Sequence, residues 1–251
     1  MPNYSTHIYL ADKILTLLDM PILNINKGCF LMGSTAPDIR IITKASRLKY
    51  HFSSLQFDKL GDGINGLFYN LPQLSEPKNL SDATSSFIAG FLTHIIADEM
   101  WIISLYRPYF ANTTYFEDSV LGNFMDRVIQ LDMDRQARDR MNNMGDVKIL
   151  IQNTRNKFNL GFISDEEISQ WRNWLLMAIS KEFSWERIRF MSKRNTSIDK
   201  IHQVDLITEN FLNSIEESIR QLYDQLPKDS IKNYQNSVIE ESEKVLRKYL
   251  K

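Results

Sequence analysis

Residues 87–106 read FIAGFLTHIIADEMWIISLY and form the longest apolar segment of the chain. A helix with this sequence is apolar on nearly every side, so we expect it to be buried in the core. His94 and Asp98 lie four residues apart, and at this spacing both side chains leave the same face of a helix. A buried imidazole and a buried carboxylate need partners, which are each other, backbone groups or a metal ion.

The composition of the whole chain is typical of a globular protein. Its 251 residues carry a formal net charge of −1, so we expect no long nucleic acid as a partner. The single cysteine excludes an internal disulfide framework, and the first residues do not follow the pattern of a secretion signal. Charged residues interrupt the most apolar stretch. We therefore expect a cytoplasmic protein with no membrane span.

The positions of proline and glycine predict long helices. No proline occurs between Pro108 and Pro227, and no glycine follows Gly161. We expect an all-α protein with one domain over residues 1–251, in which residues 1–195 form a multi-helix bundle and residues 198–251 an amphipathic helical hairpin. Residues 53–80 mix glycine, proline and aromatic residues, so they predict a long irregular loop that lines or covers a site.

Three of the four histidines stand near acidic residues or tight turns. The positions concerned are His7, Asp38, His51, His94 and Asp98. Three imidazoles and two carboxylates form a donor set that suits zinc best, with iron and manganese as alternatives. Burial of these groups without a cation would cost several kcal/mol per group, which favours a metal site over a metal-free polar network. Residues 1–195 are thus expected to be a metal-binding core.

These motifs resemble the zinc-dependent phospholipase C family, an all-helical class that also includes single-strand nucleases. The resemblance rests on TH-x(3)-A at residues 6–11, G-x(2)-APD at 33–38, HF at 51–52 and GFLTHIIAD at 90–98. It implies that Asp38, His51, His94 and Asp98 bind one zinc ion. It also implies that Asp98 bridges to a second ion held by His7, and that Asp38 is the candidate base that activates the attacking water.

The chain departs from the family pattern where a complete cluster holds a further zinc ion. Family members with that ion have an additional histidine and a later HxxxE pair, whereas this chain has no histidine between His94 and His202. We therefore expect one or two ions. Asp126, Asp132 and Asp134 are alternative ligands on the following helix, with Asp132 or Asp126 favoured among them, but the arginines beside them favour solvated ion pairs.

The donor set and the resemblance together predict a metal-dependent hydrolase of phosphate esters, of the phosphodiesterase or phospholipase C type. A zinc-activated water would attack, with Asp38 as base or orienting group. We expect a small, soluble, phosphorylated substrate. Two alternatives remain: a biosynthetic enzyme that uses a Lewis-acid metal on a non-phosphate substrate, and a non-catalytic, metal-stabilised helical interaction protein.

Overall fold

Helix α7, Asp82–Trp101, lies at the centre of the structure, as its sequence predicts. Its first turn is capped by Ser81, whose side chain accepts a hydrogen bond from the amide of Thr84. Every residue from 83 to 99 is buried. The chain then continues as a π-helical segment, Ile102–Phe110, which contains Pro108. Proline cannot donate a backbone hydrogen bond, which accounts for the departure from α-helical geometry there.

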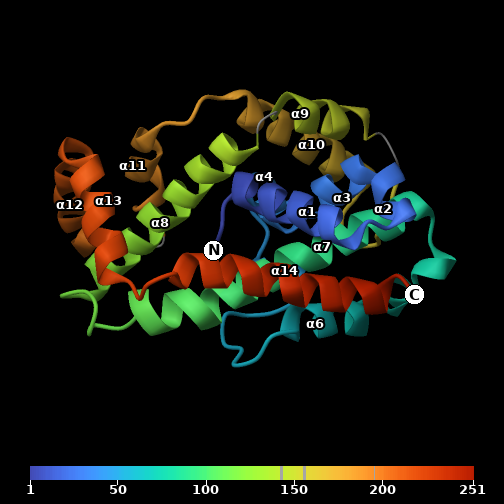
Figure 1. Ribbon diagram of the computed structural model, residues 1–251, viewed down its shortest axis with the longest axis horizontal. Coiled ribbons are helices and arrows are strands. Elements are labelled where there is room, and N and C mark those ends of the chain that lie inside the picture. The colour runs from blue at the N-terminus through green and yellow to red at the C-terminus, as the bar shows by residue number, and fades with distance from the viewer. Residues whose placement is uncertain (142–143, 155–156, 195) are drawn as a thin grey trace.

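The computed structural model describes residues 1–141, 144–154, 157–194 and 196–251. All regular elements in these ranges are helical, with no strand, so the predicted all-α class is confirmed (Figure 1). Besides α7, the α-helices are α1 Tyr4–Leu18, α2 Pro21–Ile25, α3 Lys27–Gly33, α4 Arg40–Thr43, α5 Arg47–His51, α6 Asp62–Asn70, α8 Ser119–Arg140, α9 Met144–Asn153, α10 Asp165–Ser180, α11 Ile188–Met191, α12 Ile201–Asn213, α13 Ile215–Gln225 and α14 Ser230–Tyr249.

Two glycines let α3 and α7 cross in direct backbone contact. A Cβ atom added to Gly33 would lie 2.0 Å from the carbonyl oxygen of Phe87, and one added to Gly90 would lie 2.0 Å from that of Phe30. No other residue type fits at either position without moving a backbone. The crossing holds the turn that follows α3, including Ser34, against the middle of α7.

The C-terminal region differs from the expected two-helix hairpin. Its first part divides at Ser214 into α12 and α13, and α14 packs along α7 and α1 (Figure 1). Tyr234 and Val238 of α14 are buried, and the Tyr234 hydroxyl donates to the carbonyl oxygen of Ala97 at 3.0 Å. The apolar stripe of α14 is therefore covered by the central helices and not by a neighbouring C-terminal helix.

Residues 53–80 are more regular than expected, because they contain α6 and the short 3₁₀ segments Pro72–Ser75 and Pro77–Asn79. The carboxylate of Glu99 on α7 accepts hydrogen bonds from the amides of Gly61 and Gly63, both at 2.6 Å. A carboxylate at this place stabilises the N-terminus of α6. Because the cap comes from a distant helix, the local sequence does not reveal it.

Residues 82–110 form the only helical stretch, among the described residues, that is long and apolar enough to cross a membrane. In the structure, 83% of its most apolar window is buried inside the protein. This burial is what a core helix requires.

Candidate metal centre

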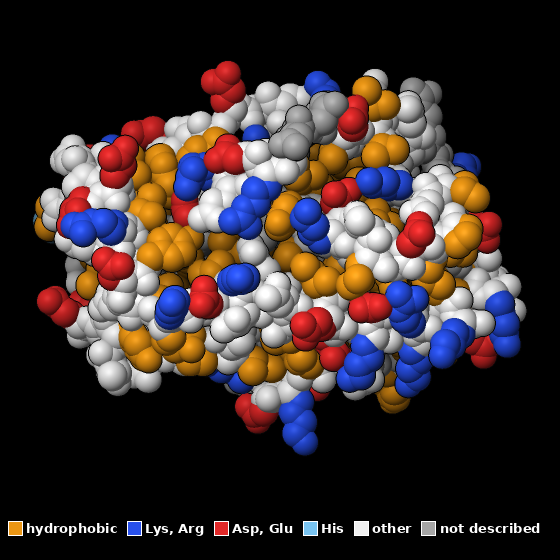
Figure 2. Space-filling model, viewed as in Figure 1, with side chains coloured by type: hydrophobic (Ala, Val, Ile, Leu, Met, Phe, Trp, Pro, Cys, Tyr) orange, Lys and Arg blue, Asp and Glu red, His pale blue; other side chains and the backbone are white. Residues whose placement is uncertain are grey.

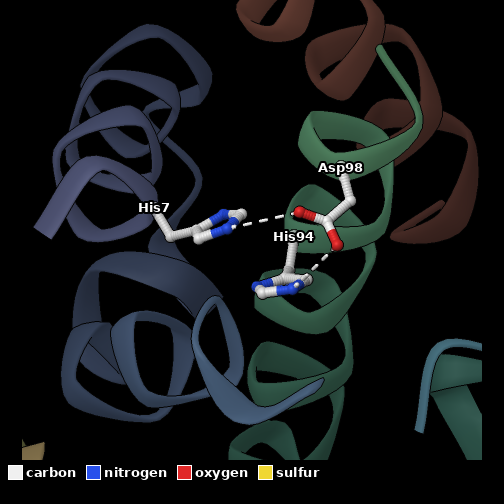
Figure 3. A group of neighbouring side chains, drawn as sticks. All are labelled: His7, His94 and Asp98. Carbon is white, nitrogen blue, oxygen red and sulfur yellow. Dashed lines mark ion pairs between the residues drawn. The ribbon is translucent and has the colours of Figure 1, made fainter. Parts of the chain in front are cut away.

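The structure brings together the five residues that the motifs single out. His7 comes from α1, Asp38 from the 3₁₀ segment Ala36–Ile39, His51 from the end of α5, and His94 and Asp98 from α7. The Asp98 carboxylate lies between the histidines, with Oδ1 at 3.6 Å from Nε2 of His7 (Figure 3). Its Oδ2 is 3.2 Å from Nε2 of His51 and 3.7 Å from Nε2 of His94.

The ligand atoms form two groups that could hold a metal ion. One consists of His7, His94 and Asp98, and the other of Asp38, His51 and His94. Within each group, the ligand atoms lie within 4.8 Å of one another. His94 belongs to both groups, and its ring stacks on that of His7 with 3.8 Å between the ring centroids.

The turn after α3 orients the ring of His94. Nδ1 of His94 lies 2.9 Å from the carbonyl oxygen of Ser34, so this nitrogen is the donor, and in the neutral ring Nε2 carries the lone pair that faces the site. The neighbouring Thr35 is fixed in turn, because its hydroxyl accepts a hydrogen bond from the indole of Trp171 at 3.1 Å. The close crossing of α3 and α7 thus places a backbone carbonyl where a ligating histidine needs one.

Several polar atoms of this cluster are buried and have no hydrogen-bond partner among the described residues. They are Nε2 of His7, both ring nitrogens of His51, Nε2 of His94 and Oδ1 of Asp98. Such atoms are rare in folded proteins, because each one loses its bonds to water without replacement. A bound cation would satisfy imidazole lone pairs and a carboxylate oxygen together. The residues therefore fit a metal ion, and the nitrogen and oxygen donors suit zinc.

The electrostatics of the metal-free cluster favour the ligand forms of His7, His51 and Asp98, whereas His94 is drawn towards its charged form. Burial lowers the pKa of His51 to about 4 and also lowers the pKa of His7, so both rings are neutral near pH 7. Burial would raise the pKa of Asp98, but the nearby charge of His94 and the imidazoles of His51 and His7 beside the carboxylate hold it well below its usual range. For His94, burial opposes the charged form, yet attraction to Asp98 outweighs it and raises the pKa.

Sequence reasoning missed one side chain of the site, Arg47. Its Nη1 lies 3.2 Å from Oδ2 of Asp98, and the Arg47 side chain is only 11% exposed. Arg47 and His51 are four residues apart on α5, so both reach the carboxylate from one helix face. That spacing from a candidate ligand is the signal that could have identified Arg47.

The alternative acidic ligands on α8 belong to neither group. Asp126 accepts hydrogen bonds from Trp101 at 2.9 Å and from Gln130 at 2.7 Å. Asp132 accepts hydrogen bonds from Tyr223, Gln136 and Arg135. Asp134 accepts hydrogen bonds from the amide of Ser5 and from the side chain of Arg187. All three carboxylates are buried, so the expected solvated ion pairs are instead internal ones. In the described part of the chain, these aspartates have structural partners and do not complete a metal cluster.

Comparison with known proteins agrees with the motifs. Residues 6–101 match the family model described as zinc dependent phospholipase C, which confirms the resemblance over less than half of the 251 residues. The matched segment contains all five residues of the cluster. Searches of curated proteins and of solved structures give no match.

Proposed function

We propose that this chain, which carries the zinc-dependent phospholipase C pattern over residues 6–101, is a metal-dependent hydrolase of phosphate esters. The observation that best supports the proposal is the set of buried, unpartnered ligand atoms where three histidines and two carboxylates converge. A zinc ion held by these residues supplies Lewis-acid polarisation of a phosphoryl oxygen and lowers the pKa of a water towards neutrality.

One ion fits the cluster better than two. Nε2 is the only lone-pair nitrogen of His94, because Nδ1 is turned to the carbonyl of Ser34, and one lone pair binds one ion. Both candidate groups include His94. In addition, the guanidinium of Arg47 already provides a positive charge at Asp98. We therefore assign the principal ion to Asp38, His51 and His94, with Asp98 as the fourth ligand that the family resemblance implies and with His7 beside Asp98.

Asp38 is the member of the cluster that reaches open space. The side chains of His7, His51, His94 and Asp98 are at most 2% exposed, whereas Asp38 is half-buried and lines a cavity of about 140 Å³. A carboxylate in this position can accept a proton from a water that enters the cavity. Asp38 is thus the proposed base or orienting group for the attacking water.

The substrate and the compartment are also part of the proposal. A small phosphorylated compound is supported by the modest size of the cavity that Asp38 lines. A cytoplasmic setting is supported by the single cysteine and by the burial of the one long apolar helix among the described residues.

Turnover of chromogenic phosphate esters tests the function. We expect the purified protein to contain zinc by elemental analysis and to hydrolyse a nitrophenyl phosphomonoester or phosphodiester. Asp38→Asn should bind zinc more weakly, because Asp38 is an assigned ligand, and at saturating zinc it should lose roughly 100-fold or more in kcat, the usual contribution of a general base. His94→Ala should lose the metal, and His202→Ala, at an exposed histidine, should match the wild type.

Other outcomes separate the alternatives. Equal rates in the wild type, Asp38→Asn and His94→Ala would show that any observed hydrolysis comes from elsewhere. Bound zinc that stabilises the fold, without turnover of any phosphate ester, would favour the metal-stabilised interaction protein or a Lewis-acid enzyme with a different substrate.

A further inference from the structure

Two cavities adjoin each other on the open side of the cluster. The Asp38 cavity, of about 140 Å³, is lined by Asp38, Arg40, Arg127 and Arg194 among others. The Trp101 cavity, of about 360 Å³, has Leu55, Trp101 and Ile102 in its wall. Arg127 and Arg194 line both cavities, so they stand at the boundary between them.

Figure 2 shows one face of the molecule, on which Lys and Arg side chains lie among Asp and Glu side chains and apolar surface. Met1 lines both cavities, as Arg127 and Arg194 do.

The Asp38 cavity has an excess of positive charge. Three guanidinium groups, from Arg40, Arg127 and Arg194, line it together with one carboxylate, that of Asp38. Within the described residues, Arg40 and Arg194 form no ion pair, so neither charge is neutralised by a protein partner. Unpaired arginines beside a cavity favour an anion in it.

Arg127 is held in position for such an anion. Its Nη1 lies 3.3 Å from Oδ2 of Asp126 and donates to Oε1 of Gln130 at 3.1 Å. Asp126 is itself fixed by the indole of Trp101. The second terminal nitrogen of Arg127, Nη2, makes no hydrogen bond to the described residues and remains available. An oriented guanidinium loses little freedom when it binds a ligand.

The Trp101 cavity suits an uncharged organic group. Its volume is within the range of small-molecule sites, and Leu55, Trp101 and Ile102 give it apolar surface. Arg107 also lines this cavity, but it is already engaged by Asp58 at 3.5 Å and by the carbonyl oxygen of Leu55 at 2.9 Å. The guanidinium groups that remain available to bind an anion are thus those that line the Asp38 cavity.

We propose that Arg127 and Arg194, with Arg40, form an anion subsite for a dianionic phosphoryl group, and that the Trp101 cavity takes the organic part of the substrate. A phosphomonoester carries close to two negative charges at neutral pH, whereas a diester carries one. Arg127 is paired with Asp126, so Arg40 and Arg194 are the two arginines of the Asp38 cavity that have no carboxylate partner among the described residues, and two such charges match the monoester. This inference rests on the proposed function and narrows its substrate class to small phosphomonoesters.

Binding of two related phosphonates tests the subsite on the protein as purified. Phenylphosphonate has two charges at mildly alkaline pH, and its monomethyl ester has one charge and an additional apolar group. We expect calorimetry to show about tenfold or more tighter binding of phenylphosphonate. If the cavities were selective only for apolar groups, the methyl ester would bind at least as well, which would overturn the proposal.

Arginine variants assign the effect to the subsite. Arg127→Gln and Arg194→Gln should each weaken phenylphosphonate binding by about tenfold and affect the methyl ester less. Arg194 is exposed, so its substitution leaves the core intact even if Arg127→Gln proves unstable. Arg189→Gln, at an exposed arginine paired with Glu209, is the matched control and should bind both compounds as the wild type does.

The readout separates this inference from the proposed function. Unchanged phenylphosphonate binding in both Arg127→Gln and Arg194→Gln would contradict the subsite, whatever the turnover. Loss of binding in these variants, in a protein that hydrolyses no phosphate ester, would support the subsite and contradict the hydrolase. A chelator-treated sample that keeps the preference for the dianion would show that the arginines, and not a metal ion, provide it.

Discussion

Nη1 of Arg47 lies 3.2 Å from Oδ2 of Asp98, the same oxygen that approaches His51 and His94. A buried carboxylate among three imidazoles thus has a guanidinium as its one permanently charged partner in the described residues. Arg47 therefore stabilises the metal-free cluster, and it competes with a metal ion for the same carboxylate.

Replacement of Arg47 by methionine should change stability and metal affinity in opposite directions. Without metal, Arg47→Met leaves Asp98 without its guanidinium partner, which should reduce the free energy of unfolding by about 3–5 kcal/mol. Zinc affinity should increase by about tenfold, because a nearby positive charge no longer opposes the ion. Urea unfolding in chelator and titration against a zinc-binding dye measure the two effects. Arg220→Met, at an exposed arginine, should alter neither; a fall in zinc affinity in Arg47→Met would contradict this account.

Zinc should stabilise the protein through the cluster. A ligand that binds only the folded state raises the free energy of unfolding by about 2.7 kcal/mol at a concentration of 100 times Kd. We expect this increase in the wild type and in His202→Ala, because His202 is exposed. His94→Ala removes the residue shared by both candidate groups and should lose most of the increase. Thermal unfolding with and without added zinc measures it, and an equal gain in His94→Ala would place the zinc elsewhere.

The crossing of α3 and α7 should tolerate no side chain at Gly90. A methyl group there would meet the carbonyl oxygen of Phe30 at 2.0 Å, so Gly90→Ala forces the backbones apart. Overpacking of this kind costs about 1–3 kcal/mol or more. It should also weaken zinc binding, because the crossing positions Ser34 against His94. Asp82→Ala, at an exposed site on the same helix, should cost less than about 1 kcal/mol. Wild-type stability in Gly90→Ala would refute the close crossing.

Part of this arrangement could be predicted from sequence, because some signals are local. Continuous apolar residues around His94 predict a buried helix, and the short motifs mark the five side chains that the structure brings together. The docking of α14 could not be predicted, since an apolar stripe shows that a helix is buried but not against which partner. The cap from Glu99 to Gly61 and Gly63 is equally non-local.

Metal-free protein should lose stability as the pH falls from about 6.5 to about 4. The pKa of His51 is about 4 in the folded protein because of burial, against an ordinary value of 6.5. Between these values the unfolded chain takes up a proton that the folded protein excludes, so the free energy of unfolding decreases. His7, whose pKa is also lowered by burial, acts in the same direction.

The other two groups of the cluster do not cancel this loss. The raised pKa of His94 contributes stability that is fully present below pH 6.5 and is lost only as the pH rises above it. The lowered pKa of Asp98 contributes stability that is lost only below the ordinary carboxyl value of 3.8. Urea midpoints measured from pH 7 to 4 in chelator should therefore fall less steeply in His51→Gln than in the wild type. His202→Gln should follow the wild type, because this side chain is exposed. Identical slopes in His51→Gln and the wild type would mean that His51 titrates normally in the folded protein.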